Sequence, residues 1–179
     1  MKNKIAISLL AILFIAISFA KAQTPAAPPA DFKPDQSVDY SKYEGMVKQY
    51  AAWYEKSSLG KDTALRAKIA GFLMAWITGA PNVTVSIGNV IEPILEEKNN
   101  IYTPDLLVAY MGGVTVYELN NPNDKNEANI EVAGLQAVLE LAKNNTALLA
   151  DSKAIKKFKG MSQDQLQQYV SDCLKKQSK

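Results

Sequence analysis

The chain has 179 residues, with 20 Lys and Arg, 18 Asp and Glu, one cysteine and no histidine. The lack of histidine excludes imidazole metal ligands and the Ser-His and Cys-His pairs of nucleophilic enzymes, and a single cysteine excludes an intramolecular disulfide. Lys and Arg form no dense patch, which nucleic-acid binding requires, so we expect no nucleic-acid partner.

The first 22 residues have the pattern of a secretory signal peptide. Lys2 and Lys4 precede an apolar run over 5–19, and Ala20 and Ala22 are small residues where a signal peptidase requires them. The run is shorter than the ~20 residues of a membrane-spanning helix, so we expect cleavage after Ala22 and no membrane span afterwards. The segment holds three of the basic residues and no acidic one, so the mature chain would carry a net charge of about −1. The predicted location is periplasmic or secreted.

Residues 23–38 contain four prolines among small and polar residues. This composition favours extended, polyproline-like conformations and offers little apolar surface to bury. It predicts a disordered linker, followed by one helical domain over 39–177.

The domain is predicted to begin with a helix over about 39–57. Its apolar residues recur every three or four positions, the period of one helical face. The face consists of Tyr43, Met46, Val47, Tyr50, Trp53 and Tyr54. These aromatic residues could stack on sugars, but at this spacing they are more often core residues with polar atoms at the edge.

The segment 62–81 is predicted to be the central core helix. Its core face consists of Leu65, Ile69, Phe72, Leu73, Trp76 and Ile77. Asp62 is expected to cap its start, and Gly79 and Pro81 to end it. Alanine and glycine fill most of its remaining surface, and a helix that is apolar nearly all round is normally buried.

Residues 83–87 alternate apolar, β-branched and polar side chains, which is the period of a strand. No partner strand is evident, so we expect a short extended connector. A short helix over about 89–98 is predicted next, with Pro93 in its first turn.

A second core helix is predicted over 103–119, because Thr-Pro-Asp is a strong helix start. It carries Tyr110 in the core and the adjacent Gly112 and Gly113. Each glycine costs about 1 kcal/mol relative to alanine in a helix, so we interpret both as sites of close helix packing, with a kink in the helix as the alternative. The expected partner is the segment around Ala70 and Gly71, which makes Gly71 the third helix-packing glycine.

Three more helices are predicted towards the end of the chain. A polar loop over 120–127 precedes a helix over about 127–143, and a shorter helix follows over about 146–158. Ser162 to Gln165 matches a capping box that starts the last helix. Cys173 lies on the apolar face of that helix and is predicted to be a small buried residue, the alternatives being a reactive thiol or a link to a second chain.

Three patterns carry some chemical meaning. Ser58 to Lys61 is an S-x-x-K pair, but the companion SDN and KTG elements of penicillin-recognising enzymes are absent. The loop 121–127 offers oxygen ligands for calcium without the spacing of an EF-hand, and helix capping explains it better. Glu92 and Glu96 lie one helical turn apart, as a carboxylate-dependent hydrolase could require, and are more simply a solvated face.

Several short segments together carry a resemblance. Residues 72–81 read FLMAWITGAP, and Val-Thr-Val at 83–85, Tyr-Met-Gly-Gly at 110–113 and Ala-Gly-Leu at 133–135 follow. Over most of 40–170 the chain resembles a set of exported helical proteins from Bacteroidetes-type bacteria, which implies export and helicity and no activity. It is similar, more weakly, to the helical, signal-peptided immunity proteins of the Rap1a/Tai type.

The sequence therefore predicts an all-α, single-domain bundle of six or seven helices without cofactor or metal. The predicted function is that of an exported, non-catalytic protein that binds another protein or an envelope component. The alternatives are an immunity-like inhibitor of a secreted toxin and a carboxylate-dependent hydrolase acting on an envelope polymer.

Overall fold

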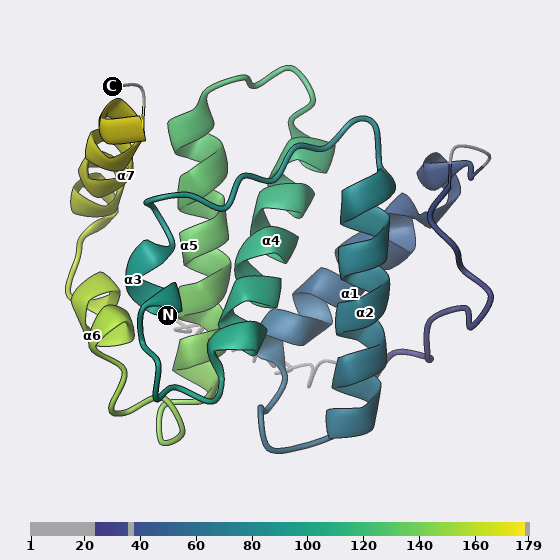
Figure 1. Ribbon diagram of the computed structural model, residues 1–179, viewed down its shortest axis with the longest axis horizontal. Coiled ribbons are helices and arrows are strands. Elements are labelled where there is room, and N and C mark those ends of the chain that lie inside the picture. Colours follow the sequence, from purple (N-terminus) through teal and green to yellow (C-terminus); the bar gives the residue numbers. More distant parts are fainter. Residues whose placement is uncertain (1–23, 36–37, 178–179) are drawn as a thin grey trace, which may run out of the picture.

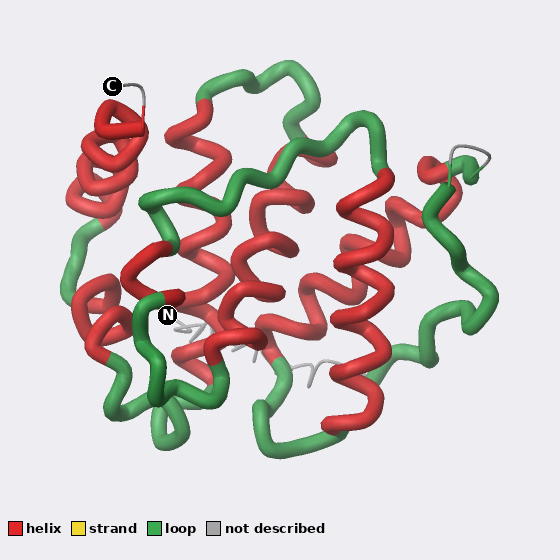
Figure 2. Tube along the Cα trace, in the orientation of Figure 1, coloured by secondary structure: helices red, strands yellow, loops and turns green. Residues whose placement is uncertain are grey.

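The computed structural model describes residues 24–35 and 38–177 (Figures 1 and 2). Over these residues the chain forms a single-domain bundle with seven α-helices, one 3-10 helix and no strand. In chain order the elements are η1 (Tyr40–Tyr43), α1 (Glu44–Lys56), α2 (Thr63–Gly79), α3 (Glu92–Leu95), α4 (Thr103–Asn120), α5 (Glu127–Asn144), α6 (Lys153–Lys159) and α7 (Gln163–Gln177). The predicted all-α fold is confirmed.

The predicted signal peptide, 1–22, lies outside the described residues. Within the described ranges, no helix combines the length and apolar character needed to cross a membrane.

The centre of the bundle is α4, which lies between α2 and α5 while α1 crosses behind it (Figure 1). Its glycines make the close contacts expected of them, although with other partners. A Cβ atom on Gly113 would lie 2.6 Å from the Ala137 Cβ and 2.7 Å from the Ala133 carbonyl oxygen, both on α5. A Cβ on Gly112 would lie 3.2 Å from the Ala51 Cβ of α1. Small residues therefore set the spacing of α4 from both helices.

The prediction for Gly71 is wrong. Gly71 is exposed, and a Cβ added there would meet no atom within 4 Å. The expected approach of Gly112 and Gly113 to Ala70 and Gly71 does not occur, because α4 presents these glycines to α1 and α5.

The helix α2 lies at the side of the bundle rather than at its centre (Figure 1). Ile69, Phe72 and Trp76 are buried as predicted, as is Tyr110 of α4, whereas Leu65 is only partly buried at the edge of the core. Helical spacing identified the buried face, but it did not show that the opposite face is exposed.

The start of α2 also differs from expectation. Asp62 has a φ of 49° and its side chain makes no capping hydrogen bond. Its carbonyl oxygen accepts from the Arg66 N–H at 2.8 Å, so the backbone alone begins the helix.

The connector between α2 and α3 crosses the bundle (Figure 2). Within it, 83–87 forms no strand, in agreement with the expected short connector. Val83 is buried and Val85 partly buried, while Ile87 is 49% exposed. Two apolar side chains thus fasten the connector to the core and leave one in solvent.

Two predicted helices are shorter than expected. The helix expected over 89–98 is the single turn α3, and the helix expected over 146–158 begins only at Lys153, as α6, after a series of turns. The capping box before α7 is confirmed, because the Ser162 N–H donates to Gln165 Oε1 (2.8 Å) and the Gln165 N–H donates to Ser162 Oγ (3.3 Å). Cys173 is buried, as predicted.

The described part of the predicted linker, residues 24–35, packs on the bundle. We call this segment the arm. Pro25 is buried, and Phe32 packs against the core. The expectation of a disordered segment missed these contacts, because proline composition does not show whether a matching surface exists elsewhere.

Candidate functional site

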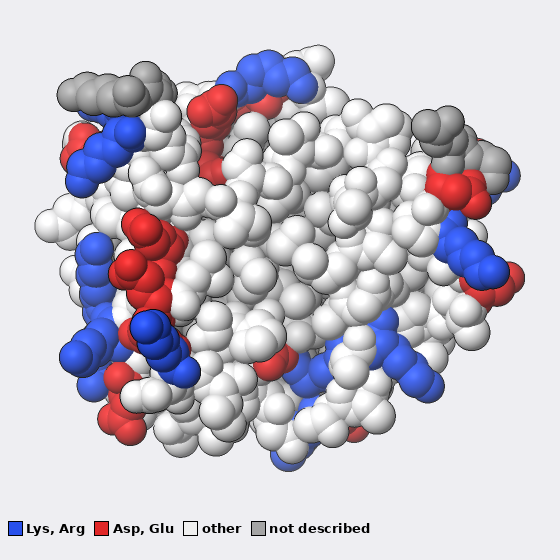
Figure 3. Space-filling view, viewed as in Figure 1, with Lys and Arg blue, Asp and Glu red and all other residues white. Residues whose placement is uncertain are grey.

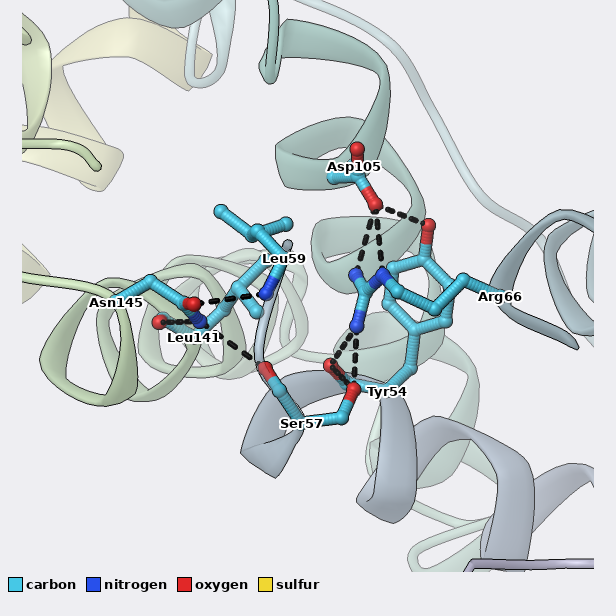
Figure 4. Close-up of polar contacts among 7 residues, drawn as sticks. All are labelled: Tyr54, Ser57, Leu59, Arg66, Asp105, Leu141 and Asn145. Carbon is cyan, nitrogen blue, oxygen red and sulfur yellow. Dashed lines mark hydrogen bonds and ion pairs between the residues drawn. The ribbon is translucent and has the colours of Figure 1, made fainter. Parts of the chain in front are cut away.

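The most highly connected polar group is the buried guanidinium of Arg66 (Figure 4). Its Nη2 and Nε donate to Asp105 Oδ1 at 2.7 and 3.2 Å, and its Nη1 donates to the Tyr54 carbonyl oxygen and to Ser57 Oγ. The guanidinium carbon lies 3.9 Å from the centre of the Tyr54 ring, and the Tyr54 hydroxyl donates to Asp105 at 2.7 Å. Burial, then the bond to Asp105, raises the pKa of Tyr54. Every nitrogen of the guanidinium is engaged within the chain, so this network ties α1, α2 and α4 together.

A second polar centre fastens the turn between α1 and α2 to the end of α5 (Figure 4). The buried Asn145 amide accepts from the Leu59 N–H at 2.8 Å and donates to the carbonyl oxygens of Ser57 and Leu141 at 3.0 and 2.9 Å. The amide has its partners within the chain, which marks it as structural.

An acidic pocket of about 440 Å³ lies between the connector, the α4–α5 end and α7. Glu118 of α4 and Glu131 of α5 line it, together with Glu127 and the single cation Lys125. We call it the acidic pocket. Figure 3 shows a largely uncharged face over α4, the connector and much of α2.

Two carboxyl groups of this pocket, those of Glu118 and Glu131, have a raised pKa. Burial raises the pKa of Glu131 to about 7, and the hydroxyl of the buried Tyr110 donates to it. Burial also raises the pKa of Glu118, which a hydrogen bond from the Thr84 N–H (3.0 Å) only partly opposes. A carboxyl group that titrates near neutral pH is suited to general acid–base chemistry. Among the described residues, no group of three His, Cys, Asp or Glu is placed to hold a metal ion.

The exposed side of α2 is the third feature. Ala67 and Gly71 are exposed and Ala75 is partly exposed, at intervals of four residues. We call these three residues the small-residue face. Along this part of α2 the only exposed charge is Lys68. The face therefore offers a surface of small side chains with one charge, Lys68, beside it.

A larger hollow of about 590 Å³ lies between the segment 96–102 and the segment 148–153. Ile101 and Leu148 line it and are 78% and 44% exposed. At its edge Glu97 Oε1 accepts from the Ala154 N–H at 2.6 Å. Burial alone would raise the pKa of Glu97, but this bond and those from neighbouring groups lower it. Glu97 therefore serves to join the two segments.

The patterns of possible chemistry in the sequence have structural explanations. Asp124 accepts from the Tyr117 hydroxyl (2.6 Å) and the Asn129 amide (2.9 Å), and Asn126 caps α5 by accepting from the Ala128 N–H. The loop is thus occupied by capping, as the sequence favoured.

The remaining candidate residues do not form a site. Glu92 and Glu96 are exposed, at the start of α3 and just after its end. Ser58 is partly buried and Lys61 exposed, and no side-chain hydrogen bond joins them. Neither pattern brings reactive groups together in a cavity.

Sequence reasoning missed Arg66 and Glu131, although their spacing contains a signal. Arg66 precedes the buried Ile69 by three positions, and Glu131 precedes the buried Leu135 by four. A charged residue that lies three or four positions from a buried apolar residue shares its helical face and so points toward the core.

Comparison of the chain with protein families, curated proteins and solved structures finds no match.

Proposed function

We propose that this chain is an exported, non-catalytic protein of the cell envelope that binds another protein through the small-residue face of α2. The observation that supports it most strongly is Gly71. In the middle of a helix, glycine is less favourable than alanine by about 1 kcal/mol, and here alanine would meet no atom within 4 Å. The fold of the single chain gives no reason for glycine at this position.

Close approach by a second chain supplies such a reason. Glycine lets another backbone come nearer than any side chain allows, and the distance between packed helices depends on the side chains at the contact. With Ala67 and Ala75 one turn to either side, the face suits a helix of the partner. Because Lys68 is the single exposed charge along this part of α2, a contact here removes little water from charged groups, which limits the cost in free energy.

The test compares two open helical glycines. Gly45 of α1 is also exposed, with no atom within 4 Å of an added Cβ, so Gly45→Leu is the matched control for Gly71→Leu. Wild type and both variants are used to capture proteins from envelope extracts, and captured proteins are then purified and titrated.

We expect Gly71→Leu to weaken binding of the captured partner at least about tenfold, while Gly45→Leu binds as wild type does. Far-UV circular dichroism checks that both variants are folded. Equal binding by all three proteins would refute the assignment to this face.

The acidic pocket favours a second function, that of a carboxylate-dependent hydrolase acting on an envelope polymer. Its supporting observation is the raised pKa of both Glu131 and Glu118 in one pocket. Glu131→Gln would then abolish release of soluble fragments from purified envelope polymers, whereas Glu127→Gln at the exposed rim would retain it. Failure of the wild-type protein to release any fragment would refute this alternative.

A further inference from the structure

The arm lies against a cluster of aromatic side chains from η1, α1 and α2, which we call the groove. The Phe32 ring centre is 5.0 Å from that of Tyr43, in an edge-to-face arrangement, and 4.9 Å from that of Phe72. Tyr50 closes the groove, with its ring 5.5 Å from Phe72. Tyr40 lies 6.4 Å from Phe32. Phe32 is thus the aromatic anchor of the arm among these rings.

Backbone recognition accompanies the anchor. The Tyr50 hydroxyl donates to the Ala26 carbonyl oxygen at 3.0 Å, and burial raises the pKa of Tyr50, which keeps the hydroxyl a donor. Pro25 is buried beside this bond, and the Phe32 N–H donates to the Pro29 carbonyl oxygen (3.4 Å) in a turn that precedes the ring. The arm contains no helix or strand and runs beside the bundle (Figure 2).

These contacts combine the features of proline-rich peptide recognition. Proline restricts an extended segment before it binds, so less conformational entropy is lost on docking, and aromatic grooves exploit this. A tyrosine hydroxyl on a peptide carbonyl adds direction to the contact. We propose that the groove formed by Tyr40, Tyr43, Tyr50 and Phe72 is a binding site for proline-rich peptides with an aromatic anchor, and that the arm of a second copy of this chain occupies it in exchange for the molecule's own arm.

The chain itself supplies the arguments for a second copy. Every molecule carries both the groove and a segment that fits it, so exchange creates no new type of contact. Fully extended, the chain from position 32 to position 40 can span at most about 28 Å, which lets an arm reach a neighbouring groove in a reciprocal, two-fold dimer. A tethered arm has an effective concentration in the millimolar range, so the molecule's own arm prevails at low protein concentration.

The first experiment titrates a fluorescent peptide of residues 24–35 into the full-length chain. Phe32→Ala in the chain removes the competing anchor and leaves the groove intact. The peptide should bind this variant about tenfold or more tightly than it binds wild type, because the tethered arm no longer competes. The same peptide with alanine in place of Phe32 is the control and should not bind.

A second substitution locates the site. Adding Tyr50→Phe to the Phe32→Ala chain removes one hydroxyl and should weaken peptide binding by about threefold to tenfold. Far-UV circular dichroism establishes that the variants are folded. If folded Phe32→Ala does not bind the peptide, or if wild type binds it equally well, the groove is not a peptide site.

The second experiment tests the exchange by complementation. Phe32→Ala has a groove without an anchored arm, and Tyr43→Ala has an arm without a complete groove. We expect a mixture to form a one-to-one complex in sedimentation velocity, at concentrations where each variant alone is monomeric. If the mixture sediments as monomers while the free peptide still saturates Phe32→Ala, exchange between copies is refuted. Neither experiment involves Gly71, so both are independent of binding through the small-residue face.

Discussion

Replacing Gly113 by alanine tests whether the α4–α5 spacing is set by this glycine. Alanine favours the helix by about 1 kcal/mol relative to glycine. Its Cβ, however, would lie 2.7 Å from the Ala133 carbonyl oxygen, where ordinary contacts begin at 3.4 Å. The obstacle is backbone, so α5 would have to move by roughly 0.7 Å. Overpacking of this kind costs about 1–3 kcal/mol, and the upper part of this range applies where a backbone must shift. After the gain of about 1 kcal/mol from helix propensity is subtracted, we expect Gly113→Ala to lower the free energy of unfolding by about 1–2 kcal/mol.

Urea unfolding followed by far-UV circular dichroism measures this difference. In a domain of this size a loss of 1–2 kcal/mol lowers the melting temperature by about 3–6 °C. The control is Gly71→Ala, the same substitution at an open position, which should gain up to about 1 kcal/mol. If Gly113→Ala is as stable as wild type or more so, the inferred contact does not set the spacing.

Three further substitutions test the polar groups. Burial raises the pKa of Glu131 from 4.5 to about 7, so the folded state binds this proton more tightly and the free energy of unfolding falls as the pH rises between these values. Urea unfolding at pH 5 and pH 7.5 should show a smaller fall for Glu131→Gln than for wild type. An equal fall in both proteins would contradict the assignment. Arg66→Met leaves Asp105 without its buried partner and should lower the free energy of unfolding by about 3 kcal/mol. Adding Asp105→Asn to the same chain should restore part of this loss. An unchanged unfolding midpoint for Arg66→Met would refute the prediction. Asn145→Ala leaves the buried Leu59 N–H without its acceptor and should lower the free energy of unfolding by about 2 kcal/mol. Asn144→Ala, at the exposed neighbouring position, should change it by no more than about 0.5 kcal/mol. Equal losses would contradict a specific role for Asn145.

The helices and much of the core could be predicted because each depends on local spacing. The three-and-four-residue period identified Phe72, Trp76 and Tyr110 as buried. The capping box at Ser162 and Gln165 could be predicted for the same reason, since its partners are three residues apart and the motif contains both halves of the interaction.

Which surfaces meet depends on contacts that local spacing does not contain. Gly71 and Gly113 have similar sequence surroundings, in helices of similar apolar character. One faces solvent and the other faces α5, because that outcome depends on which helix packs beside each position. The docking of Phe32 was missed for a related reason: its composition marks the arm as extended, while the rings that receive it belong to three later elements.

The candidate site was the hardest part to predict. Glu118 and Glu131 belong to different helices, and their raised pKa values come from burial under the connector and α7. Sequence reasoning considered Glu92 and Glu96 because they are neighbours on one turn. A shared pocket requires the tertiary arrangement, and the helical phase of Glu131, which sequence reasoning did not use, could at most have placed that side chain on the inner face of its helix.

The bond between Leu59 and Asn145 spans 86 positions of the chain, and this has a consequence for the order of folding. Closing so long a loop costs conformational entropy, and contacts offset this cost only when α5 is in place. The turn between α1 and α2 should therefore reach its final conformation late, after most of the chain has been synthesised. Until then, the N-terminal pair of helices can assemble only as a loosely joined hairpin, and limited proteolysis of growing chains should cut at that turn first.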